Sequence, residues 1–214
     1  MSESNPIFYT GLYQLHDPLA NRPFRLDPID EDWIHKLDAC ALFQGKFQPV
    51  KPVTLKAAMG GQATDFLWSR LPPLVCVSER VIALLNKYKF SGWSTYPVKV
   101  YDRKNNYLDG YYGFAVTSSV GEDKKDIDIS RSQIVTKPPI VPGGKSYMVY
   151  KGLYFDESKW DGSDIFRLIG YIIVTSQVRE MFKKEKITNV RFDSLIDHES
   201  DVSDFKTTKV ETGQ

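Results

Sequence analysis

Cysteine, histidine and charge of a single sign are all scarce in this 214-residue chain. It has two cysteines and three histidines, and its 28 basic residues nearly balance its 27 acidic ones. Two cysteines cannot build a disulfide framework, and the histidines lack the spacing of a zinc site. A net charge of +1 provides no field that would attract nucleic acid or an anionic membrane. We therefore expect no metal, no cofactor and no nucleic-acid partner.

Long apolar runs are missing as well. No segment approaches the ~20 apolar residues that a membrane-spanning helix needs, and the first six residues lack the features of a secretory signal. We expect a cytoplasmic protein with no membrane partner. Cys40 and Cys76 both stand among apolar residues, which predicts two buried, reduced thiols.

The composition is that of a well-packed globular protein, with an apolar share of 42% and an aromatic share of 13%. Its strand-like and helix-like segments predict an α+β fold with mixed, mainly antiparallel sheets. The polar stretch 117–126 is the clearest internal boundary. It divides an N-terminal half (1–121) from a C-terminal half (122–205), which a polar tail (206–214) follows. We expect the halves to pack as one globular body.

The same strand-helix-strand pattern occurs twice, at 74–98 and at 171–195. The first copy begins with an apolar run, which predicts a strand buried on both faces. Ser78 follows as a candidate helix cap, and the spacing of apolar residues then predicts an amphipathic helix over 79–89. A shift of 97 places aligns Val81 with Val178, Leu84 with Met181, Leu85 with Phe182, Phe90 with Ile187, Trp93 with Val190, and Val98 with Leu195. We interpret this match as a duplication. The alternative is that burial alone imposes the pattern on any strand-helix-strand unit.

The remaining segments give weaker signals. The predicted elements are a strand over 6–15, a short helix after Asp30, a connection over 44–64 with at most one helical turn or short strand, a hairpin of 98–101 with 111–116, and strands at 127–135 and 147–155.

No catalytic motif is complete. The run Gly143-Gly144-Lys145-Ser146 resembles the end of a phosphate-binding loop, but Pro139 stands where that loop needs glycine and no amphipathic helix follows. A flexible hairpin tip is the better interpretation. The histidines His16, His35 and His198 lie far apart and form no recognisable triad.

One surface is a candidate for protein binding. Aromatic residues dominate binding hot spots when they are exposed, and the exit of the first copy is rich in them: Trp93, Tyr96, Tyr107, Tyr111 and Tyr112. Core packing is the alternative for these residues. The helix of the second copy has a basic outer face, for which simple solvation is the default: Arg179, Lys183, Lys184, Lys186 and Arg191.

The first copy carries a family resemblance. The run from Pro73 to Val81, followed by Gly92 and Tyr96-Pro97-Val98, resembles a bacterial family first described as a domain of unknown function and later grouped with polymorphic-toxin immunity proteins. The second copy is similar to that family's C-terminal segment. It departs from the pattern at Thr175-Ser176-Gln177, where the family has a serine-glutamate pair, and at Asn189, where the family has glycine.

This resemblance implies a non-enzymatic protein that binds and neutralises a cognate toxin. Such a function needs a complementary surface and no active site. The competing hypothesis is an enzyme or ligand-binding protein whose pocket lies between the two units, with Asp65, Glu79 and Asp164 as its candidate acids. The sequence predicts neither the binding face nor the oligomeric state.

Overall fold

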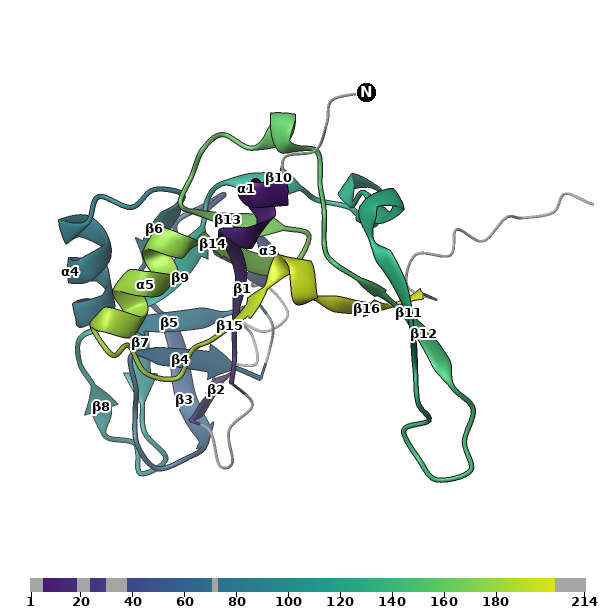
Figure 1. Ribbon diagram of the computed structural model, residues 1–214. Helices are drawn as coiled ribbons and strands as arrows, with labels where there is room; N and C mark the ends of the chain where they lie inside the picture. Colours follow the sequence, from purple (N-terminus) through teal and green to yellow (C-terminus); the bar gives the residue numbers. More distant parts are fainter. Residues whose placement is uncertain (1–5, 19–23, 30–37, 71–72, 203–214) are drawn as a thin grey trace, which may run out of the picture.

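The computed structural model describes residues 6–18, 24–29, 38–70 and 73–202 (Figure 1). The fold is α+β with mixed, mostly antiparallel sheets, as predicted. The helix expected after Asp30 and the polar tail lie outside the described residues. The helices are α1 (Pro6–Thr10), α3 (Ala39–Phe43), α4 (Glu79–Lys87) and α5 (Ser176–Lys184), and the short 3-10 helices are η1 (Lys124–Asp126), η2 (Ile129–Arg131), η3 (Glu157–Lys159) and η4 (Leu195–Asp197).

The largest sheet has eight strands. In order across the sheet they are β6 (Trp93–Tyr96), β9 (Tyr111–Val116), β5 (Val75–Ser78), β4 (Phe66–Ser69), β2 (Arg25–Pro28), β3 (Val53–Met59), β7 (Val98–Tyr101) and β8 (Tyr107–Leu108). Only Pro97 separates β6 from β7, although these strands lie near opposite ends of that order, so the sheet curls on itself. A buried apolar cluster fills the curl, including Leu26, Leu55, Cys76, Tyr96 and Val100.

Two smaller sheets complete the fold. The five-stranded sheet runs in the order β10 (Ser119–Gly121), β13 (Ile165–Leu168), β14 (Tyr171–Thr175), β1 (Leu12–His16) and β15 (Arg191–Ser194). The three-stranded sheet runs in the order β11 (Gln133–Lys137), β12 (Tyr147–Lys151) and β16 (Glu199–Asp201). Strand β1 comes from the N-terminal half but pairs with β14 and β15, so the two sequence halves interlock.

The structure confirms two similar strand-helix-strand units and extends the similarity to strand order. In the first unit the hairpin β4–β5 leads into α4 and then β6, and β9 lies between β5 and β6. In the second unit β13–β14 leads into α5 and then β15, and β1 lies between β14 and β15. Both inserted strands are antiparallel to both of their neighbours.

Backbone geometry agrees between the units at equivalent positions. Lys89 and Lys186, which follow the two helices, have φ angles of 57° and 54°. Three residues later Gly92 and Asn189 also have positive φ, at 87° and 62°. At the helix starts, the backbone N–H groups of Glu79 and Ser176 donate to the carbonyls of Gly110 and Gly11, both at 2.7 Å. Asn189 is therefore the local equivalent of the first unit's glycine.

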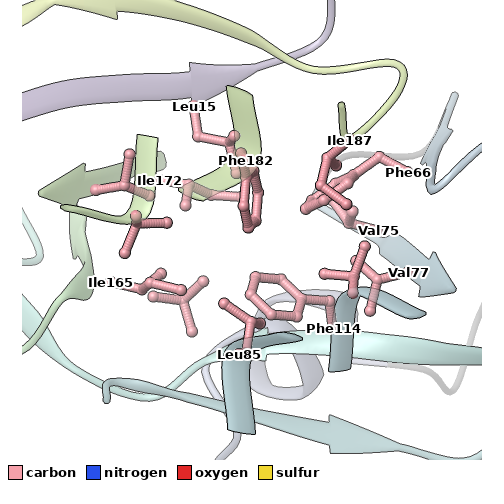
Figure 2. Packing of buried hydrophobic residues seen from close by; sticks show 14 of the residues in the cluster. Leu15, Phe66, Val75, Val77, Leu85, Phe114, Ile165, Ile172, Phe182 and Ile187 are labelled. Atoms are coloured by element: carbon pink, nitrogen blue, oxygen red, sulfur yellow. The ribbon is translucent and has the colours of Figure 1, made fainter. Parts of the chain in front are cut away.

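The largest buried cluster joins the two units. It takes side chains from α4, α5 and both large sheets, so neither unit has a complete core alone. Figure 2 shows Phe182 of α5 beside Ile172 and Leu15, with Phe114 and Leu85 from the first unit facing them. The rings of Phe66 and Phe182 lie 5.7 Å apart across this junction. Burial of this shared core holds the units together.

Several sequence predictions are wrong in detail. The expected strand over 6–15 begins as α1, because Tyr9 is buried and its hydroxyl donates to the carbonyl of Phe155 at 2.8 Å, a tertiary contact that local propensity cannot foresee. The connection over 44–64 contains β3, a seven-residue strand with alternating burial. The hairpin partner of β7 is β8, while β9 pairs with β5 and β6.

The two cysteines differ in exposure. Cys76 is fully buried in β5, as predicted, and burial raises the pKa of its thiol. Cys40 is exposed, which contradicts the prediction. The apolar residues around Cys40 belong to α3, which buries Leu42 and Phe43 and turns Cys40 toward solvent. Apolar neighbours on a helix therefore did not imply a buried position.

Candidate protein-binding site

The five predicted aromatic residues divide into core and surface positions. Trp93 is half-buried, its indole N–H donates to the carbonyl of Phe90 at 2.8 Å, and its ring stacks near Phe114. The hydroxyl of Tyr111 donates to the carbonyl of Thr64 at 3.0 Å. Both side chains therefore contribute mainly to packing.

Tyr96 is a core residue with 2% of its surface exposed. Its ring lies against Gly113, where an added Cβ would come within 2.1 Å of the ring. Burial raises the pKa of the Tyr96 hydroxyl, which has no hydrogen-bond partner among the described residues. Tyr96 offers no surface to a partner, whereas Tyr107 and Tyr112 are exposed on β8 and β9.

A second, larger set of exposed apolar side chains was not predicted from the sequence. Strands β11 and β12 form a hairpin that projects from the body of the molecule, and residues 133–151 are called the arm below (Figure 1). Its exposed apolar residues are Ile134, Ile140, Val141, Tyr147 and Met148. Ile140 at the tip is 84% exposed, so it makes almost no contact within the chain.

Strand register places two of these side chains on one face of the arm. Ile134 pairs with Tyr150, and Thr136 pairs with Met148. Directly opposed residues in an antiparallel ladder point to the same face, so Ile134, Tyr150 and Met148 share a face. Val149, one residue out of phase, points to the other face and is 6% exposed. Ile134 and Met148 are 60% and 52% exposed, and exposed apolar patches often mark binding sites.

The base of the arm is firmly attached. Lys137 and Lys151 form ion pairs with Glu199 and Asp197, at 2.6 and 2.9 Å. Next to the arm, the Arg131 guanidinium lies 4.8 Å from the ring centroids of both Tyr9 and Tyr154. These contacts join the hairpin to its neighbours and leave Ile134, Met148 and the tip exposed.

A sequence signal for the arm exists in hindsight. Ile140 and Val141 stand between Pro139 and Pro142, in a loop where polar residues are the norm. Proline lacks the N–H of a strand ladder, so Pro138-Pro139 ends β11 and holds this apolar pair at the tip.

The candidate acids of the enzyme hypothesis make structural contacts. One oxygen of the Asp65 carboxylate accepts hydrogen bonds from the backbone N–H and the hydroxyl of Thr188, both at 2.9 Å. Asp164 accepts the equivalent pair from Ser91, also at 2.9 Å. In each unit, the aspartate just before the first strand thus forms hydrogen bonds to the turn that follows the other unit's helix. Glu79 is exposed in the first turn of α4, where the helix dipole favours an acid.

Ser78 occupies the predicted N-cap position of α4, but its side chain does not cap the helix. Instead its hydroxyl donates to Asp65 at 3.0 Å, and Arg80 also binds this carboxylate, at 3.2 Å. The hydroxyl therefore supports the contact between units and leaves the helix start to the carbonyl of Gly110.

A pocket of about 230 Å³ lies at the junction of the units. Equivalent residues of the two β-hairpins meet there, Val75 with Ile172 and Leu74 with Tyr171, and Trp68 adds an aromatic wall. Its lining is mostly apolar, with His16 and Asp17 among the polar members. This volume is below the roughly 300 Å³ at which pockets for drug-sized ligands begin, so a molecule bound here would be small.

No group of three or more potential metal-binding side chains is found in the part of the chain that the structure describes. Within that part, no helix is long and apolar enough to cross a membrane. No protein-family model matches the sequence, and a search of curated proteins finds no match.

Proposed function

We propose that the protein is a non-enzymatic immunity protein that binds a cognate bacterial toxin in the cytoplasm and neutralises it. The observation that carries the proposal is the exposed apolar face of the arm, together with its tip. A three-stranded sheet with an uncovered apolar face gains stability when a partner buries that face. Tyr107 and Tyr112 supply further exposed aromatic surface.

The arm suits protein binding better than catalysis. Its exposed Ile134, Ile140 and Met148 side chains have no nucleophilic or acid-base chemistry, and β12 is joined to β16 by strand pairing, as suits a preorganised interface. Its outer strand β11 is a sheet edge among the described residues, so a partner strand could also extend the sheet. Neutralisation then follows from covering the toxin's working surface, which needs an interface of roughly 1,200 to 2,000 Å².

The test is co-expression with the toxin encoded beside the gene. The wild-type protein should restore growth and co-purify with the toxin. The double variant Ile134→Asp, Met148→Asp should lose about 2 kcal/mol or more of binding free energy, a weakening of about thirtyfold. Gln133→Asp is the matched control, because this exposed neighbour points to the opposite face.

A melting curve should show both variants folded before binding is compared. Failure of the wild-type protein to bind or protect against any product of a neighbouring gene would refute the proposed function. Equal binding by the wild type and the double variant would refute the arm as the interface, and Tyr107→Ala with Tyr112→Ala would then test the exposed tyrosines of β8 and β9 instead.

The junction pocket supports a second candidate function, the binding of a small molecule between the units. A thermal-shift screen in which one compound raises the melting temperature would favour it. A ligand-bound structure with the compound against Trp68 and Ile172 would establish the site, and binding elsewhere would exclude it.

A further inference from the structure

A basic groove lies between α5 and β15, on the second unit. It has a volume of about 620 Å³, and four cationic side chains line it: Arg179, Lys183, Lys186 and Arg191. Apolar side chains, among them the half-buried Val190 and Phe192, line it between these cations. The groove therefore combines positive charge with an accessible apolar surface.

The positive charges are only partly balanced. Arg179 pairs with Glu180 at 2.5 Å, and Arg191 pairs with Asp193 at 2.9 Å. Lys183 and Lys186 have no ion pair among the residues that the structure describes. Nor does the buried Nε atom of Arg179 have a hydrogen-bond partner there. The groove has an excess of two positive charges in a protein of net charge +1.

The first unit provides an internal comparison, because the same fold surrounds equivalent positions. A shift of 97 places aligns Arg179 with Ile82, Lys183 with Asn86, Lys186 with Lys89, and Arg191 with Ser94. Three of the four cations thus have uncharged counterparts. The helix dipole favours cations in and just after the last turn, which accounts for Lys186 and Lys183 but not for Arg179 or Arg191. The fold does not require this charge.

We propose that the groove binds an acidic segment of a protein, in which carboxylates flank an apolar side chain. The carboxylates would pair with Lys183 and Lys186, and the apolar side chain would cover Val190 and Phe192. Charge complementarity selects an acidic partner, and the apolar lining favours a polypeptide over nucleic acid, whose phosphates need a longer basic track. The site is separate from the arm and does not rest on the immunity function.

The test uses the full chain and a short fluorescent peptide with glutamates on both sides of one phenylalanine. Binding is followed by anisotropy at two salt concentrations, with a peptide containing lysines in place of the glutamates as reference. Lys183→Glu with Lys186→Glu should weaken binding by about tenfold or more, since it replaces attraction with repulsion. Lys87→Glu with Lys89→Glu is the matched control, because it changes the net charge equally at the C-terminal end of the other unit's helix.

Support requires binding of the glutamate peptide alone, loss of binding in the groove variant, and retention in the control. Equal weakening by both double variants would overturn the proposal, because binding would then follow net charge. Failure of the glutamate peptide to bind above the lysine peptide would also overturn it, as would tighter, groove-dependent binding of a single-stranded oligonucleotide. Ile134→Asp should leave peptide binding unchanged, so failure here and failure of toxin binding are separate results.

Discussion

Gly92 provides a sharp test of how the two units meet. Its φ angle of +87° lies in the left-handed region, and an added Cβ would come within 1.9 Å of the carbonyl oxygen of Ile165. The preceding residue, Ser91, accepts a hydrogen bond from the N–H of Ile165 at 3.1 Å. Gly92→Ala therefore cannot be accommodated by rotating a side chain. Either β13 or the turn after α4 must move by more than an ångström.

Three costs follow from this movement. Alanine in the left-handed conformation costs about 1 to 2 kcal/mol. Displacing a packed strand costs about 1 to 3 kcal/mol, and loss of the Ile165 hydrogen bond adds about 1 kcal/mol. We expect Gly92→Ala to lower the free energy of unfolding by about 3 to 6 kcal/mol, which is a large share of the stability of a single domain.

Asn189→Gly is the matched change in the second unit. Asn189 has a φ angle of +62°, and its side-chain amide donates to the carbonyl of Phe66 at 2.7 Å. Glycine removes that hydrogen bond, at a cost of about 1 kcal/mol, but adopts positive φ without strain. The expected loss is about 1 kcal/mol or less. The two equivalent positions should thus respond very differently to small substitutions.

Urea unfolding, followed by tryptophan fluorescence, measures both effects through the transition midpoint at an unchanged slope. Far-ultraviolet circular dichroism should give the same midpoint if unfolding is two-state. A loss below about 1 kcal/mol for Gly92→Ala would refute the close approach of Gly92 to Ile165. A larger loss for Asn189→Gly than for Gly92→Ala would refute the proposed division of roles.

Three further predictions concern buried polar groups and thiols. Asp65→Ala should destabilise more than Asp164→Ala in urea unfolding, by about 1 to 2 kcal/mol, because Asp65 accepts more hydrogen bonds and is more buried; equal losses would contradict this ranking. Burial lowers the pKa of His198 below its usual 6.5, so the unfolded state binds the proton more readily than the folded state. The free energy of unfolding should therefore be full above pH 6.5 and fall as the pH drops below that value. In melting curves recorded over a pH series, His198→Gln should flatten this decline. In native protein iodoacetamide should alkylate Cys40 alone, and mass spectrometry that found Cys76 modified at the same rate would contradict its burial.

The repeated units were predictable because burial imposes local, periodic patterns. The continuous apolar run before Ser78 predicted a strand buried on both faces, and Val75, Cys76 and Val77 in β5 are all buried. The 3.6-residue spacing likewise located α4, which ends at Lys87. These signals depend only on neighbours in sequence.

Pairing between distant segments could not be predicted in this way. The strand pattern at 111–116 was correct, but nothing local indicated that β9 would pair with β5 and β6. The arm was missed for a related reason. Ile134 and Met148 look like ordinary strand residues, and only the packing of the whole chain leaves them uncovered. Tyr96 shows the reverse case, an aromatic candidate that the curled sheet encloses.

The position of β1 has a consequence for synthesis. In the first unit the inserted strand β9 follows β6 within a short stretch of chain, so that unit can assemble early. In the second unit the inserted strand is β1, and its neighbours β14 and β15 emerge from the ribosome some 160 residues later. Leu12 and Leu15 therefore stay without their native neighbours for most of translation. Contacts of such long sequence separation form slowly. We therefore expect the shared core to be completed late, and slow translation late in the message to prolong the period in which β1 can pair wrongly.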